Sequence, residues 1–275
     1  MRINIFLISN RLMGLYPNDS SYTVWFMNST KTLRTKLIGM TLRFLERYFF
    51  DPKLRRVLKT AITQSLDKSN SKREDLIFLD IGANRGQTVK SLKAIFPKSR
   101  IYSFEPDPTI FKTLSNFSKI IDVKCFNMAL GKSSGRFPFW VSPIDETSTL
   151  HLPDIDSDWH KKKAALLGLS PLDMYKRIEV EVTTIDEFVY REKIDYIDLL
   201  KIDVEGGEFE VLLGASETFE KGLISVVQFE SHNDDLRPSR TQEIQAFLSS
   251  FNFSKVSTIK HSFGDFYDEV WLKRL

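Results

Sequence analysis

The sequence predicts an α/β protein: a mostly parallel sheet flanked by helices, closed by a C-terminal antiparallel hairpin. In residues 76–107 an apolar strand, a glycine turn, a helical pattern and a second strand follow one another, as in a βαβ unit. Residues 194–203 form another apolar strand that ends in an acid, Asp203. Two strand-like segments, 253–259 and 269–273, lie close together near the C-terminus and predict the hairpin.

Between these segments, strand and helix patterns alternate along the chain. The expected strands are 76–80, 101–104, 120–126, 194–203 and 224–230, and the expected helices are 109–117, 209–215 and 240–251. Residues 132–184 interrupt the alternation with two strand-like segments, 136–141 and 178–182. Because this insertion follows the third strand, we expect it to overhang the acceptor site.

Composition restricts the protein's class and compartment. With 275 residues, 42% hydrophobic and 27% charged, the chain is long enough for one well-filled globular domain plus an extension. Its single cysteine, Cys125, cannot form an internal disulfide, so a cytoplasmic location is expected. The four histidines show no zinc-ligand spacing. No apolar run reaches the roughly 20 residues of a membrane span.

Charge separates the N-terminal part of the chain from the rest. Residues 31–73 hold twelve Lys or Arg and three acids, whereas the whole chain has a net charge of only +3. We therefore expect a basic helical extension, 1–72, with helices near 32–50 and 54–66, before a catalytic domain, 73–275. Its basic face is either solvated or makes a peripheral contact with anionic membrane, which salt-sensitive vesicle sedimentation would test. No nucleic-acid-binding pattern is visible, so no nucleic-acid partner is expected.

The glycine turn indicates which ligand the first βαβ unit holds. It reads Asp80-x-Gly82-x-x-x-Gly86, without the spacing of a dinucleotide turn and without the Gly-Lys-Ser/Thr of a P-loop. A carboxylate two residues before the first glycine would repel a diphosphate but suits an ammonium group. We expect the glycines to let a ligand approach the backbone closely. Glu105, at the tip of the second strand, can accept both hydroxyls of a ribose. The turn therefore favours S-adenosylmethionine.

An ordered series of motifs makes the resemblance to a family specific. The segments are FLDIGANRGQ, YSFEPDP, NMALG, the Thr-Ile-Asp of VTTIDEF, and LLKIDVEGGEFEVLLGA. Together they resemble the FkbM family of S-adenosylmethionine-dependent methyltransferases over roughly residues 76–230. The resemblance implies a Rossmann-like methyltransferase fold and methyl transfer to oxygen, often of a sugar or polyketide hydroxyl. The first seventy-odd residues are not explained by it.

Site roles follow from the motifs and the resemblance together. Asp80 would face the ammonium group of the donor, and Glu105 would bind its ribose. Asn127 and Met128 would flank the adenine. The full set of expected cofactor-binding residues is Asp80, Gly82, Ala83, Asn84, Gly86, Glu105, Pro106, Asn127 and Met128.

The expected catalytic residues follow two central strands. Methyl transfer to a hydroxyl needs the acceptor oxygen aligned and its proton removed. The candidates for that work are Asp203, Glu205, Glu230 and His232. Lys201 could form a buried pair with one of these acids. The same acids could hold a magnesium ion that binds the acceptor; the sequence leaves this open and indicates no other metal site.

The sequence alone leaves open two interpretations that assign the protein to another functional class. One is a non-catalytic scaffold that binds S-adenosylmethionine and uses its basic helices for targeting. The other is an NAD-dependent oxidoreductase on the same fold, against which stand the missing middle glycine and the absence of a Tyr-x-x-x-Lys pair. On family grounds we expect a small-molecule or glycan acceptor with a saccharide hydroxyl. The sequence gives no indication of the oligomeric state.

Overall fold

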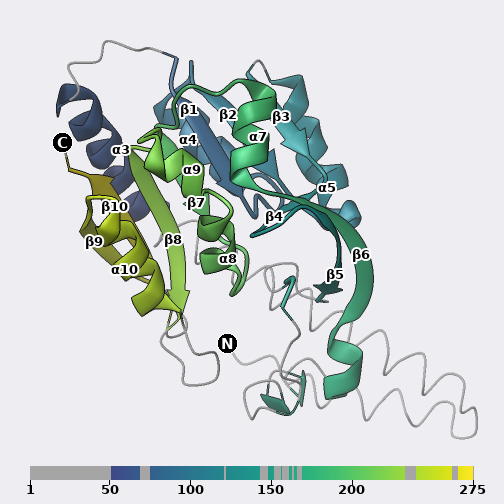
Figure 1. Ribbon diagram of the computed structural model, residues 1–275. Coiled ribbons are helices and arrows are strands. Elements are labelled where there is room, and N and C mark those ends of the chain that lie inside the picture. Colours follow the sequence, from purple (N-terminus) through teal and green to yellow (C-terminus); the bar gives the residue numbers. More distant parts are fainter. Residues whose placement is uncertain are drawn as a thin grey trace, which may run out of the picture.

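The computed structural model has a central seven-stranded sheet in the order β3-β2-β1-β7-β8-β10-β9 (Figure 1). It describes residues 51–68, 75–120, 122–142, 148–151, 156, 161–162, 164–165, 169–232, 240–261 and 266–274. The sheet's strands are β1 (Ile77–Ile81), β2 (Arg100–Phe104), β3 (Val123–Phe126), β7 (Leu199–Ile202), β8 (Val226–His232), β9 (Phe253–Lys260) and β10 (Phe266–Lys273). β10 pairs antiparallel with both β8 and β9, whereas β3, β2, β1, β7 and β8 are parallel. The predicted fold class is confirmed.

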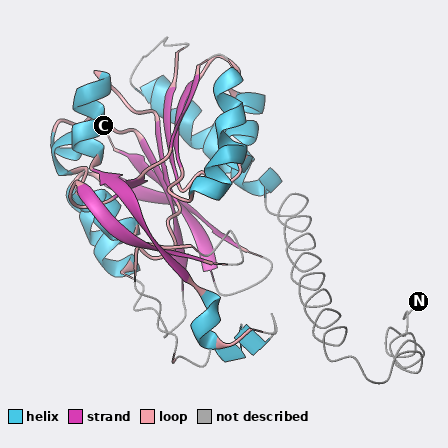
Figure 2. Cartoon of the chain, turned by 90° about the vertical axis from the view of Figure 1, so that its right-hand side faces the viewer, coloured by secondary structure: helices cyan, strands magenta, loops and turns pink. Residues whose placement is uncertain are grey.

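Helices cover both faces of this sheet (Figure 2). They are α3 (Asp51–Lys68), α4 (Gln87–Ile95), α5 (Pro108–Leu114), α7 (Ile185–Glu192), α8 (Glu208–Leu213), α9 (Ser216–Glu220) and α10 (Thr241–Ser250), with short 3₁₀ turns η2 (Ser115–Lys119) and η4 (Pro171–Met174). Because side chains alternate along a strand, β1 contributes Phe78 to the core under α3 and α4 and Leu79 to the core under α7 and α8. Burial on both faces is why β1 and β7 read as continuous apolar runs.

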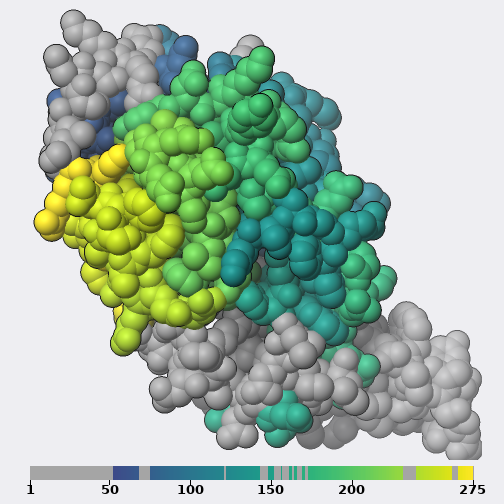
Figure 3. Space-filling view, in the orientation of Figure 1, coloured from purple at the N-terminus to yellow at the C-terminus, as the bar shows by residue number. Residues whose placement is uncertain are grey.

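The two strands of the insertion form a second sheet together with β4 (Ala129–Leu130), which precedes them. β4 pairs parallel with β6 (Lys176–Thr183), which pairs antiparallel with β5 (Gly135–Val141). A small core of Ala129, Phe139, Val180 and Val182 fills one face of this sheet. In the space-filling view the teal and green insertion lies on the opposite side of the molecule from the yellow terminal hairpin, and residues of β7 to β8 lie between them (Figure 3).

Several element boundaries differ from those the sequence indicates. The third strand begins at Val123 rather than at residue 120, because Asp122 adopts a left-handed conformation (φ 64°) that ends the preceding turn. The strand expected at 194–203 is shorter and begins at Leu199. Helices α7 and α9 were not expected. The helix expected near 32–50 lies outside the described residues.

Helix α3, the described part of the expected extension, packs against the central sheet. Leu58, Ala61 and Ile62 are almost fully buried and share a core with Phe78 and Val270. The division at residues 72 and 73 stays a prediction, as does the membrane contact of residues 31–73, because much of that stretch is not described. Among the described residues, no helix combines the length and the apolar character that crossing a membrane requires.

Candidate active site

The candidate site lies where the strand order changes direction. From β1 the chain adds β2 and β3 on one side, and β7 and β8 stand on the other. β1 and β7 are neighbours, with Asp80 opposite Lys201 in the register. In open α/β sheets ligands bind at the carboxyl ends of the strands next to such a switch point. Asp80 and Asp203 both lie at this edge.

The glycine turn is hydrogen-bonded to β2 and lies in close contact with the residue that follows β7. The backbone N–H groups of Gly82 and Ala83 both donate to the carbonyl of Phe104, at 3.1 and 2.9 Å. Gly82 has a φ of 75°, and a Cβ there would lie 1.7 Å from the carbonyl oxygen of Asp203. A Cβ on Gly86 would meet the ring of Phe117 at 2.6 Å. The atoms that make glycine necessary here therefore belong to the protein itself, whereas the sequence suggested a ligand.

Glu105 closes the turn from β2. Its Oε2 accepts the N–H of Asn84 at 3.0 Å, and its Oε1 accepts the N–H of Asp107 at 2.8 Å. Burial raises the pKa of this carboxyl to about 7, although both backbone hydrogen bonds act to lower it. A carboxylate has about four acceptor positions, so two remain for ligand hydroxyls. The ribose contact of Glu105 stays a prediction.

The other predicted cofactor residues lie around this turn. Within the described structure, Asn84 Oδ1 is buried and has no hydrogen-bond partner, which leaves an acceptor for a ligand hydroxyl or ammonium group. The amide of Asn127 donates to the carbonyls of Glu105 and Pro106, at 2.8 and 3.0 Å. Met128 packs against the core under α7 and also lines a surface cavity of about 340 Å³ beside β5 and β6. Their contacts with adenine stay predictions.

Lys201 links the glycine turn to the carboxylate that follows β7. Its ammonium lies 3.3 Å from Asp80 Oδ1, 3.2 Å from Asp203 Oδ2 and 2.9 Å from the carbonyl of Gly82. Burial would lower the pKa of Lys201, but the carboxylates of Asp203 and Asp80 raise it above its ordinary value. Burial also raises the pKa of Asp80, which Lys201 opposes. The expected buried pair therefore exists and involves two acids.

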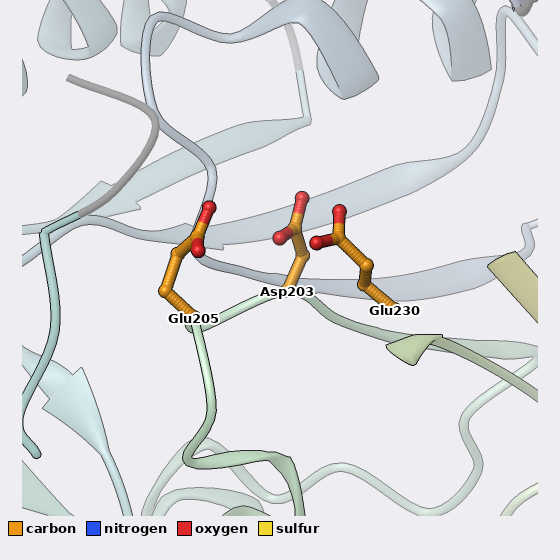
Figure 4. Close-up of side chains that lie close together, drawn as sticks. All are labelled: Asp203, Glu205 and Glu230. Carbon is orange, nitrogen blue, oxygen red and sulfur yellow. The ribbon is translucent and has the colours of Figure 1, made fainter. Parts of the chain in front are cut away.

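Three of the four predicted catalytic residues come together (Figure 4). Asp203 lies between Glu205 and Glu230, and one oxygen of each carboxylate lies within 4.8 Å of the others. Glu205 has a left-handed backbone (φ 59°), uncommon for a residue with a side chain. His232 ends β8 opposite Phe266, and its side chain lies outside the described part. The cluster has the ligand types that a hard cation prefers.

Crowding of negative charge changes the protonation of Glu230. Burial raises its pKa well above the ordinary value, and the neighbouring carboxylates of Asp203, Asp268 and Glu208 raise it further, while Lys201 opposes them. Like charges this close disfavour simultaneous ionisation. The pKa of Glu230 is therefore raised, whereas the Asp203 carboxylate has the Lys201 ammonium as a partner. Of the cluster, Asp203 is the better placed to accept a proton.

Sequence reasoning missed the residue that shapes the loop under this cluster. Glu208 is 5% exposed, and its Oε1 accepts the N–H groups of Val204 and Gly206, at 3.2 and 3.1 Å. These bonds hold the turn that carries Glu205. A buried acid at the first position of a helix is a recognisable signal for such a role, because carboxylates are favoured at helix N-termini.

Known proteins similar to this chain are methyltransferases. This chain is 28% identical over 148 residues to the 2-O-methyltransferase NoeI of Sinorhizobium fredii, and the match covers 54% of this chain and 60% of that protein. It is 29% identical over 193 residues to the methyltransferase sdnD of Sordaria araneosa, covering 64% and 72%. It is also 25% identical over 163 residues to the hexuronic acid methyltransferase AglP of Haloferax volcanii, covering 58% and 59%.

A family model covers most of the described domain. The methyltransferase FkbM domain matches residues 80–255, from the first residue of the glycine-turn motif to the terminal hairpin. This range includes the turn, Glu105, Lys201 and the three carboxylates, and it agrees with the resemblance that the motifs carry. The chain belongs to the FkbM methyltransferase family.

Proposed function

We propose that the protein is an S-adenosylmethionine-dependent O-methyltransferase whose acceptor is a saccharide hydroxyl. The observation that carries this is the arrangement at one sheet edge: the glycine turn and Glu105 on one side, the carboxylate cluster on the other, and Lys201 between them. The alternative NAD-dependent oxidoreductase loses its support, because the family match is to methyltransferases. The non-catalytic scaffold remains for the assay below to exclude.

The residues around the turn fit the proposed donor. The ligand would bring ribose hydroxyls to Glu105, a donor group to the unpaired Asn84 Oδ1, and an ammonium group to the neighbourhood of Asp80. When bound, S-adenosylmethionine supplies a methyl group on a sulfonium, which is already a good leaving group. The protein's remaining task is to align the acceptor and take its proton.

Asp203 has the geometry for the proton-accepting role. Its carboxylate lies at the carboxyl end of β7, and Lys201 holds it at 3.2 Å. When the acceptor hydroxyl is methylated, Asp203 would take up its proton. Glu230, whose pKa burial and neighbouring carboxylates raise, would orient the acceptor or Asp203 by a hydrogen bond.

The saccharide class rests on the relatives. One similar protein is a 2-O-methyltransferase and another is a hexuronic acid methyltransferase. The chain spans 60% of the length of the first and 59% of the second, so their activities support the proposal without carrying over residue by residue. We also propose that the insertion of residues 132–184 lies over the acceptor site. From the single cysteine we propose a cytoplasmic location.

Incubation with S-adenosylmethionine bearing a deuterated methyl group and a panel of hexuronic acids and neutral hexoses tests this function. We expect a labelled monomethyl product by mass spectrometry, and we expect Asp203→Asn to lower the rate by about 10²-fold or more, as for loss of a general base. Because Lys201 already supplies a cation to Asp203, activity should persist in EDTA. Loss in EDTA with recovery in magnesium would instead assign the carboxylates to a metal. Absence of product with every acceptor would contradict the saccharide assignment.

A further inference from the structure

The insertion brings one histidine to the loop that carries the carboxylates. His151 ends the short segment 148–151, which is fixed to β5 through paired backbone hydrogen bonds between Trp140 and Thr149, at 2.8 and 3.1 Å. Thr149 is buried, and its hydroxyl accepts the N–H of His151 at 3.1 Å. The imidazole therefore projects from an anchored backbone.

The imidazole fits against the glycine pair after β7. His151 Nε2 lies 3.5 Å from Glu210 Oε2, on α8. A Cβ on Gly207 would lie 3.2 Å from the same nitrogen, so glycine leaves the room that the ring occupies. Gly207 closes the loop that begins at Asp203. His151 is thus a residue of the insertion placed beside the carboxylate loop.

Glu210 is also held in place by Arg240. Arg240, which precedes α10, pairs with Glu210 Oε1, and its guanidinium lies 4.2 Å from the ring centroid of Phe209. Burial would raise the pKa of Glu210, but His151 and Arg240 lower it below its ordinary value. Glu210 Oε2 is buried and accepts no hydrogen bond within the described residues. A fixed, ionised oxygen therefore faces the imidazole and has capacity for one donor.

We propose that His151 binds a hydroxyl of the saccharide acceptor next to the one that is methylated. In the neutral imidazole one nitrogen donates and the other accepts. In the proposed state the proton sits on Nε2, toward Glu210 Oε2 at 3.5 Å, which leaves Nδ1 to accept from the saccharide; the side chain is 46% exposed. Glu210 and Arg240 are positioning residues that act through the ring. This inference rests on the proposed function and deepens it: the insertion selects acceptors that carry a neighbouring hydroxyl.

Nuclear magnetic resonance of the histidine rings tests this directly, because the chain has only four histidines. Full-length protein labelled with ¹⁵N at histidine is saturated with S-adenosylhomocysteine and titrated with glucuronic acid and with mannose. His151→Gln assigns the signal. We expect the Nε2–H tautomer at His151 and a saturable shift of its Nδ1 resonance with at least one saccharide. The Michaelis constants of wild type and variants are measured with the same sugars.

Kinetics separate acceptor binding from a purely structural role. His151→Ala should raise the acceptor KM about tenfold, the worth of one hydrogen bond, with kcat changed less than about twofold, and His151→Gln should restore part of the loss. Glu210→Gln should raise the same KM, and Lys221→Ala, on the surface of α9, should not. If a saccharide is methylated but does not shift the Nδ1 resonance of His151, this inference is wrong and the proposed function stands. Failure of S-adenosylhomocysteine to bind would overturn the proposed function and this inference together.

Discussion

Replacing Lys201 by methionine should destabilise the fold by about 3–5 kcal/mol, the effect of breaking a buried ion pair from one side. Lys201 is 5% exposed and its ammonium is shared by Asp80, Asp203 and the carbonyl of Gly82. Methionine fills a similar volume but leaves Asp80, which is fully buried, without its cation. Denaturant unfolding, followed by circular dichroism, measures the change.

A double-mutant cycle identifies the cause of that loss. Asp80→Asn in the Lys201→Met background removes the uncompensated charge and keeps a polar partner for Ser103, whose hydroxyl lies 3.4 Å from Asp80. We therefore expect it to restore much of the stability. Lys221→Met breaks an exposed pair with Glu217 and should cost less than about 0.5 kcal/mol. A Lys201→Met protein as stable as wild type would contradict the account of this network.

Substituting alanine for Gly82 should have the next largest effect, a loss of about 2–5 kcal/mol together with loss of donor binding. The left-handed φ of 75° costs about 1–2 kcal/mol for an L-residue. Overpacking adds about 1–3 kcal/mol, because the Cβ would lie 1.7 Å from the carbonyl oxygen of Asp203. Relief of that clash must separate β1 from β7 at the carboxyl edge, where the ligand is expected.

Gly222 offers a matched control for this substitution. Its φ is 70°, close to that of Gly82, but the nearest atom to a Cβ is the ammonium of Lys273, at the end of a flexible side chain. Gly222→Ala should therefore show the conformational cost with little of the clash. Both variants are compared by denaturant unfolding and by titration with S-adenosylhomocysteine. Equal losses of stability for the two would contradict the contact between the turn and Asp203.

Sequence patterns predicted the parts of the fold that depend on local order. The strands at β1 and β2, the turn between β1 and α4 and the terminal hairpin follow from apolar runs and glycine spacing. Helix α7 was missed although Thr184 accepts the N–H of Glu187 at its start, as the pattern Thr-x-x-Glu of a capping box indicates. A strand followed at once by an eight-residue helix offers little periodicity to detect.

The site was predictable where its residues follow strands and unpredictable where distant segments meet. Asp203 follows β7 and Glu230 lies near the end of the adjacent parallel strand β8, so their approach followed from the parallel sheet alone. His151 reaches its place through a segment bound to β5, and Arg240 through the start of α10. No spacing in the sequence indicates that these residues meet at Glu210. For Glu208 the acid at the start of α8 is a signal in the sequence, but the turn that it holds is visible only in three dimensions.

Calorimetric titration with S-adenosylhomocysteine at pH 6 and pH 8 tests the central claim most directly. In the proposed function ribose hydroxyls would donate to an ionised Glu105, and burial raises the pKa of this carboxyl to about 7. The carboxyl is mostly protonated at pH 6, so affinity should be lost as the pH falls through 7, by about tenfold at one unit below the pKa. Glu105→Gln should remove this pH dependence. At pH 8 Glu105→Ala should weaken binding by about 1.5–3 kcal/mol. An affinity for S-adenosylhomocysteine that is unchanged by both variants and by pH would contradict the assignment of the donor site.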